Sequence, residues 1–150
     1  MRVDRVRLEG FRNYSRLEAA FSPGVNVIYG ENAQGKTNLL EAVAYLSTAS
    51  SHRARYDREL IQMGEEAALV RAGLLSRDRD FTLEARLRRG QRRQLSSNGV
   101  RLKSAGELSG ILNTVLFCPE DLSLIRAGAA ERRRFLDGCI SQLRPRYAAA

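Results

Sequence analysis

Residues 30–37 read Gly30-Glu31-Asn32-Ala33-Gln34-Gly35-Lys36-Thr37 and complete the phosphate-loop pattern G-x-x-x-x-G-K-[ST]. Glycines at both ends of such a loop allow backbone angles that turn successive N–H groups toward phosphate oxygens. Lys36 supplies a positive charge for the outer phosphates, and the Thr37 hydroxyl is a natural Mg²⁺ ligand. The pattern therefore predicts a nucleoside triphosphate site with Mg²⁺.

The residues on either side favour a strand before the loop and a helix after it. The run 25–29 is β-favouring and follows the turn Ser22-Pro23-Gly24. After the loop, apolar residues recur at helical spacing, with Asn38, Glu41 and Ser47 on the polar side. Strand, loop and helix in this order are the context in which such a loop binds phosphate. The alternative is a glycine-rich turn without a ligand.

Composition limits the class of protein. The 150 residues suit one domain, or one large piece of a bigger protein, and a hydrophobic fraction of 43% is sufficient for a core. No apolar stretch is long enough to span a membrane, and the charged start of the chain is not a secretory signal. Cys118 and Cys139 show neither metal-ligand spacing nor a disulfide pattern. We therefore expect a cytoplasmic protein with reduced thiols and no membrane partner.

The net charge of +8 favours a polyanionic partner. Residues 71–103 contain ten basic residues and three acidic ones, which is nearly the whole excess. Because arginine suits bidentate phosphate contacts, four arginines of this segment are candidates for contact with DNA or phosphate. These are Arg88, Arg89, Arg92 and Arg93. The alternative is a solvated sheet face, since Phe81 is the only aromatic residue there on which a base could stack.

Hydrophobic alternation predicts further strands, most of them in an antiparallel meander over residues 67–103. The predicted strands are 2–8, 17–21, 25–29, 68–75, 81–87, 92–96, 100–103 and 113–118. Asn98-Gly99 is a strong signal for a two-residue hairpin turn. Helices are predicted after the phosphate loop and at 58–63, 104–112 and 129–143, with a capping box at Ser104 and Glu107. The result is an α/β fold in which the meander packs on the helix that follows the loop.

A complete P-loop ATPase also needs an acidic strand end that holds Mg²⁺ and an element that positions the attacking water. The only apolar run that ends in carboxylates is 115–121, and Pro119 interrupts it. Leu108-Ser109-Gly110 begins like an ABC signature loop but continues with Ile111-Leu112, which indicates ordinary helix. We therefore expect one half of a composite site, able to bind a nucleotide without efficient hydrolysis.

Five stretches of the chain, in order, resemble the RecF family of bacterial recombination-mediator ATPases, which is related to the SMC-like ABC ATPases. The stretches are 8–14, 29–42, 51–53, 115–122 and 131–137. The sequence of the loop and its flanking residues, Tyr-Gly-Glu-Asn-Ala-Gln-Gly-Lys-Thr-Asn, is far more specific to this family than the generic pattern. The resemblance implies an ABC-type ATPase head of which residues 1–150 are the N-terminal part, with the C-terminal part absent.

The resemblance also implies a function: an ATP-binding, DNA-binding protein of recombinational repair, replication and SOS induction, with weak DNA-dependent ATPase activity at full length. Implied partners are single-stranded DNA or single-strand/duplex junctions, recombination-mediator proteins, and a second copy in an ATP-dependent homodimer. By matching position, Arg12 and Asn13 approach the nucleotide, and Arg53 lies near the phosphates or the DNA. The segment 119–121 corresponds to a loop that senses Mg²⁺ and the γ-phosphate. For Arg12 and Arg53 the alternative is a surface salt bridge.

Two other functions stay open. A P-loop small-molecule kinase, or another P-loop NTPase, would use the same loop, but a kinase needs an arginine lid and an acceptor pocket. A non-enzymatic nucleic-acid binder would carry the loop without using it.

Overall fold

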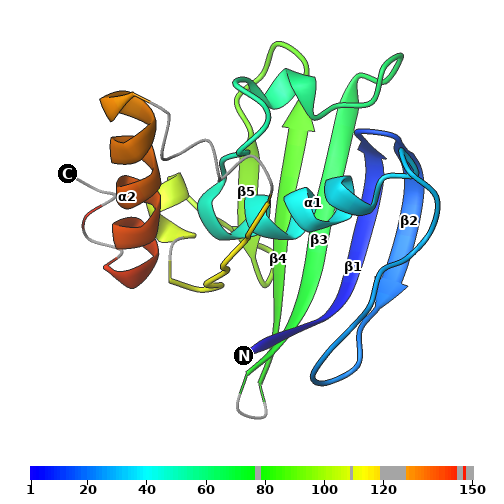
Figure 1. Ribbon diagram of the computed structural model, residues 1–150, viewed down its shortest axis with the longest axis horizontal. Helices are drawn as coiled ribbons and strands as arrows, with labels where there is room; N and C mark the ends of the chain where they lie inside the picture. The colour runs from blue at the N-terminus through cyan, green and yellow to red at the C-terminus, as the bar shows by residue number, and fades with distance from the viewer. Residues whose placement is uncertain (77–78, 109, 119–127, 145–146, 148–150) are drawn as a thin grey trace.

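The computed structural model describes residues 1–76, 79–108, 110–118, 128–144 and 147. A six-stranded sheet with the order β2-β1-β3-β4-β5-β6 carries helix α1 across one face, and helix α2 lies to one side (Figure 1). Every neighbouring pair of strands is antiparallel. The strands are β1 (Arg2–Phe11), β2 (Tyr14–Ala20), β3 (Ala67–Ser76), β4 (Arg79–Arg88), β5 (Gln94–Ser97) and β6 (Val100–Arg101). The helices are α1 (Lys36–Thr48), α2 (Ala129–Leu143) and two short 3-10 turns, η1 (Asp57–Glu59) and η2 (Ala105–Glu107).

The core lies between α1 and the inner face of the sheet. Side chains alternate across a strand, so β1 turns Val6 and Leu8 inward and Arg7 outward. From α1, Tyr45 and Leu46 are fully buried against the strands. This helix therefore holds the phosphate loop against the sheet through its apolar face.

The outer face of the sheet is polar and its charges are largely paired. One cross-strand row runs over all six strands: Glu18, Arg7, Arg71, Glu84, Ser96 and Arg101. Within it, Glu84 accepts hydrogen bonds from Arg71 at 2.6 Å and from Arg86 at 2.5 Å. Burial raises the pKa of Glu84, but these two bonds and charges outweigh it and hold the pKa below its ordinary value. Two of the meander's arginines thus belong to a paired sheet face.

The meander, its hairpin and the last helix are confirmed. Asn98 and Gly99 have φ values of +51° and +77°, as a primed two-residue turn requires. Helix α2 has the predicted bounds, 129–143. Among the described residues no helix is long and apolar enough to cross a bilayer.

Two predicted strands are wrong. Segments 25–29 and 113–118 belong to no strand, and several of their apolar side chains are exposed: Val25 is 90% and Phe117 77% exposed, although Cys118 is buried. Strand formation needs a hydrogen-bonded neighbour as well as β-favouring residues, and within the described ranges neither segment pairs with a strand. Their sequence is suited to a sheet that the described residues do not complete.

Two predicted helices are also wrong. Over 58–63 only η1 forms, because Ile61 bridges to Phe11 and the Gln62 amide donates to the Gly10 carbonyl. Over 104–108 and 110–112, the described part of the second segment, only η2 forms, and the Glu107 carboxylate accepts a bond from the Lys103 amide instead of closing a capping box. In both places tertiary or neighbouring contacts take the backbone groups that a longer helix would use.

Gly10 offers a test of this packing. It has φ +55°, and a Cβ there would lie 2.5 Å from the Ala67 carbonyl oxygen of β3. Gly24 is a matched control, since it has φ +85° but no neighbouring atom within 4 Å. We expect Gly24→Ala to lower the free energy of unfolding by about 1–2 kcal/mol through backbone strain alone. Gly10→Ala should cost about 1–3 kcal/mol more through the clash, measured by urea unfolding. Equal losses would contradict the close approach of β1 and β3.

Candidate nucleotide site

The phosphate loop has the backbone shape that its sequence predicts. Gly30 and Gly35 have φ values of +149° and +99°, and Ala33 also lies in the left-handed region at +66°. Such residues turn N–H groups toward one side and form an anion-binding concavity. Gly35 is the N-cap of α1 and supplies no side-chain cap, so the first amides of the helix keep their donors for a ligand. The left-handed conformation of Ala33 has no signal in the sequence, since alanine rarely adopts it.

The Lys36 side chain closes over this loop. Its Nζ donates hydrogen bonds to the carbonyl oxygens of Gly30 at 2.7 Å and Glu31 at 2.5 Å. An ammonium group held there is positioned to exchange these carbonyls for the oxygens of the outer phosphates. Thr37 is exposed on the first turn of α1, where its hydroxyl is available to a hydrated Mg²⁺ that accompanies a triphosphate.

The turn between β1 and β2 packs directly against the loop. A Cβ at Gly35 would lie 2.6 Å from Asn13 Oδ1 and 2.9 Å from the Tyr14 ring, so any other residue here would have to displace these side chains and adopt a strained φ of +99°. The structure thus places Asn13 beside the phosphate loop. Its contact with a nucleotide stays a prediction.

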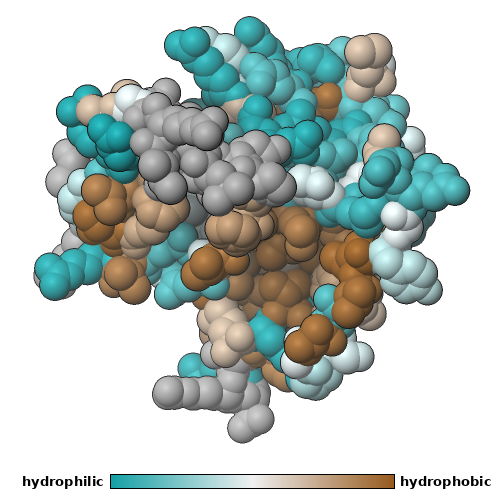
Figure 2. Space-filling model, in the orientation of Figure 1, coloured by the Kyte–Doolittle hydropathy of each residue, from teal (hydrophilic) through white to brown (hydrophobic). Residues whose placement is uncertain are grey.

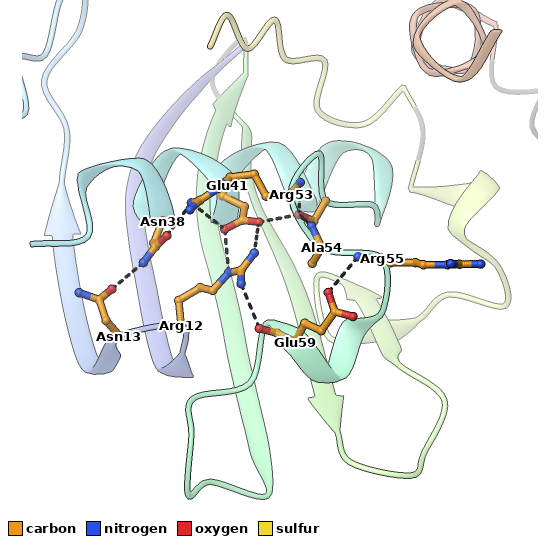
Figure 3. A network of polar contacts seen from close by, with 9 residues as sticks. Arg12, Asn13, Asn38, Glu41, Arg53, Ala54, Arg55 and Glu59 are labelled. Atoms are coloured by element: carbon orange, nitrogen blue, oxygen red, sulfur yellow. Dashed lines mark hydrogen bonds and ion pairs between the residues drawn. The ribbon is translucent and has the colours of Figure 1, made fainter. Parts of the chain in front are cut away.

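Glu41 is the centre of a polar network behind the loop (Figure 3). The Arg12 guanidinium donates to both carboxylate oxygens, from Nε at 2.9 Å and from Nη2 at 2.7 Å. The Ser51 hydroxyl donates at 2.5 Å, and Arg53 Nη1 lies 3.8 Å from Oε2. Glu41 was predicted on the polar side of α1, and that prediction is wrong, because its side chain is 0% exposed. Three donors and two positive charges compensate for the water that this carboxylate has lost.

The same network reaches back to the loop. Arg53 Nη1 donates to Asn38 Oδ1 at 2.9 Å, and Asn38 Nδ2 donates to Asn13 Oδ1 at 2.8 Å (Figure 3). The β1–β2 turn, the first turn of α1 and the segment after α1 are therefore joined by side-chain contacts. Arg12 and Arg53 both face Glu41, and a role for either one toward a nucleotide or DNA stays a prediction.

Burial raises the pKa of Glu41, since the charged form loses its hydration. The hydrogen bonds from Arg12 and Ser51 and the charges of Arg12 and Arg53 lower it, and together they outweigh burial. The pKa is therefore below its ordinary value, and Glu41 is ionised at neutral pH.

The four arginines predicted to contact DNA lie at or near the turn between β4 and β5. Arg89 Nε donates to the Glu65 carbonyl at 2.8 Å, and Arg93 Nη1 lies 3.1 Å from Asp57 Oδ2. Arg92 lines a cleft of about 220 Å³, and Arg88 is exposed at the end of β4. The structure therefore groups them apart from the paired outer face of the sheet. The predicted Mg²⁺-sensing segment 119–121 lies outside the described residues.

Sequence reasoning missed a second network, which anchors this end of the sheet to α1. The Tyr45 hydroxyl donates to Asp57 Oδ1 at 2.9 Å, and Arg93 approaches the same carboxylate. Burial and the nearby Asp57 charge raise the pKa of Tyr45. The only sequence signal was a tyrosine among the apolar positions of the predicted helix.

Residues 5–114 match the family model described as AAA domain, which is more than half of the chain. With the loop geometry above, this places the chain among the P-loop ATPases, and it belongs to the AAA domain family.

Within that class the chain is similar to proteins named DNA replication and repair protein RecF. It is 44% identical over 147 residues to the protein of Lachnoclostridium phytofermentans, covering 98% of this chain and 41% of that protein. It is 45% identical over 147 residues to the protein of Symbiobacterium thermophilum, covering 98% and 39%. The predicted resemblance is confirmed, and the chain spans about 40% of the length of these relatives.

Solved structures agree on the fold. The recombination mediator protein RecF with ATP, of the RecFOR pathway, is 39% identical with a TM-score of 0.89, covering 94% of this chain and 39% of that one. An SMC ATPase, studied for ATP-driven dimerization and DNA-stimulated activation, has a TM-score of 0.71 at 22% identity, covering 91% and 98%. The predicted ATPase-head fold is confirmed.

Glu41→Gln tests the network, because it keeps the side-chain shape and removes the charge that faces Arg12. We expect the free energy of unfolding at pH 7 to fall by about 2–4 kcal/mol. A carboxylate whose pKa is lower in the folded protein stabilises the fold at pH values above its pKa in the unfolded chain, which is about 4.3 for glutamate. That stabilisation is lost as the pH falls through the pKa of the folded protein. The difference between the two proteins should therefore shrink below about pH 4 in urea unfolding.

Glu18→Gln is the matched control, since Glu18 is 57% exposed and pairs with arginine on the sheet surface. It should change the stability by less than about 1 kcal/mol. A Glu41→Gln effect as small as this, or one that does not change with pH, would contradict the role given to the buried carboxylate.

Proposed function

We propose that the chain binds ATP through residues 30–37, with Mg²⁺ held by Thr37 and by phosphate oxygens. One observation carries the proposal: Lys36 Nζ is folded over a loop with positive φ at Gly30, Ala33 and Gly35, at the start of α1. Such a loop offers backbone donors, a helix N-terminus and a mobile cation to one triphosphate. The similarity to a RecF structure that contains ATP supports the same nucleotide.

We propose that residues 1–150 form the N-terminal part of an ABC-type ATPase head. The chain spans about 40% of the length of its RecF relatives, and segments 25–29 and 113–118 belong to no strand and expose most of their large apolar side chains. A hydrophobic area is also open in the lower middle of the view in Figure 2. β-Favouring segments with exposed apolar side chains and no paired strand are expected where further strands complete a sheet.

The wider function proposed is that of a RecF-like protein, acting in recombinational repair, replication and SOS induction in the cytoplasm. Its partners would be DNA, recombination-mediator proteins, and a second copy in an ATP-dependent homodimer. The support is the similarity to proteins named for DNA replication and repair and for the RecFOR pathway. For the 150 residues alone we propose nucleotide binding without efficient hydrolysis.

Lys36→Ala tests the nucleotide site. Removing the ammonium group should weaken Mg²⁺·ATP binding at least about tenfold, or about 1.4 kcal/mol, in titration calorimetry. Arg5→Ala is the control, because Arg5 is an exposed cation on the outer face of β1 and its loss should leave the affinity unchanged. If Lys36→Ala bound ATP like the wild type, the loop would not be the nucleotide site.

A further inference from the structure

We propose that Tyr56 and the basic residues around it form a contact surface for single-stranded nucleic acid. The surface lies at the end of the sheet where η1 meets the β4–β5 turn. The inference rests on the DNA-binding function proposed above and names where and how the strand is held.

The fold brings the aromatic ring of Tyr56 close to the basic β4–β5 turn. This proximity cannot be read from the sequence. Phe81, the aromatic residue within the basic segment, packs against the hydrophobic core. Tyr56 is distant in sequence, but the next residue, Asp57, accepts hydrogen bonds from Arg93 Nη1 at 3.1 and 3.2 Å. Because Tyr56 is 47% exposed, its ring is accessible beside the arginine-rich turn.

Two guanidinium groups accompany this ring. The Cζ atoms of Arg58 and Arg55 lie 4.7 Å and 5.4 Å from the centroid of the Tyr56 ring, within cation–π range. Aromatic rings and arginine planes are both surfaces on which unpaired bases stack. Both arginines are exposed, so the cluster offers a stacking platform that is positively charged.

A cleft for the backbone phosphates begins one residue away. Asp57 lines a cleft of about 220 Å³ together with Arg92, Lys103 and Ser104. Arg92 and Lys103 are exposed, whereas the charge of Arg93 is paired with Asp57. A phosphate next to a base on Tyr56 would therefore meet a guanidinium, an ammonium and a hydroxyl.

The charges of this surface are available, unlike those on the outer face of the sheet. There Arg71 and Arg86 both pair with Glu84. In the part of the chain that the structure describes, Arg58, Arg92 and Lys103 form no ion pair, and Glu107 accepts the Lys103 backbone amide. Hydrophilic residues also cover this upper end of the molecule in Figure 2. A polyanion therefore finds uncompensated cations here.

The aromatic ring selects single strands over duplexes. Bases in a duplex are stacked on one another and cannot lie on a protein side chain, whereas unpaired bases can. Phosphate contacts alone would hold both forms, so the ring is the feature that distinguishes them.

The experiment measures fluorescence anisotropy of a dye-labelled oligothymidine, and of a duplex of equal length, with the 150-residue chain. Tyr56→Ala should weaken single-strand binding about tenfold, as the loss of one stacked base does, and duplex binding less than about twofold. Tyr56→Phe should restore the single-strand affinity, because the ring remains. Lys103→Ala should lower the slope of log affinity against log salt by about 0.7 for the single strand.

Arg16→Ala is the control, since Arg16 is a 68% exposed arginine on β2 at the far edge of the sheet, and it should match the wild type. If the wild type binds neither probe, the proposed DNA function itself is wrong. If it binds but Tyr56→Ala and Lys103→Ala behave like Arg16→Ala, DNA binding stands and this surface is wrong. Equal losses for the two probes with Tyr56→Ala would overturn the stacking contact.

Discussion

The ion pair between Arg12 and Glu41 holds the candidate nucleotide site together. A fully buried carboxylate in a helix is costly, and it persists only where hydrogen bonds and opposite charges compensate for lost hydration. Arg12 brings the β1–β2 turn to α1, and the next residue, Asn13, then lies against Gly35 of the phosphate loop. The apolar face of α1 holds the phosphate loop against the sheet, and this buried ion pair fixes the β1–β2 turn beside the loop.

The segment that follows α1 connects the two proposed sites. Its first part is bonded to the phosphate-loop helix, through Ser51 to Glu41 and through Arg53 to Asn38. A few residues further on, Tyr56 and Arg58 form the proposed contact surface for a nucleic-acid strand. The same short segment therefore contacts the helix that begins at the phosphate loop and carries the proposed contact surface.

Local patterns predicted the phosphate loop, its helix, the meander and the Asn98-Gly99 hairpin, because each depends on residues close in sequence. They failed where a distant partner decides the outcome. Segments 25–29 and 113–118 have β-favouring residues, but a strand also needs a paired neighbour. Glu41 has the spacing of an exposed helix position, and its partner Arg12 lies 29 residues away. The contact of Asp57 with Arg93, which brings Tyr56 to the basic turn, spans 36 residues and has no local signal.

Hydrogen exchange of backbone amides, with and without saturating Mg²⁺·ATP, shows whether the amides of residues 31–37 hold the triphosphate and whether side-chain contacts join this loop to residues 51–55. We expect slower exchange with ATP at 31–37 and, to a smaller extent, at 51–55, while β5 and β6, at the edge of the sheet opposite β2, stay unchanged. Unchanged exchange at 31–37 with ATP bound, or protection confined to other parts of the chain, would contradict the account.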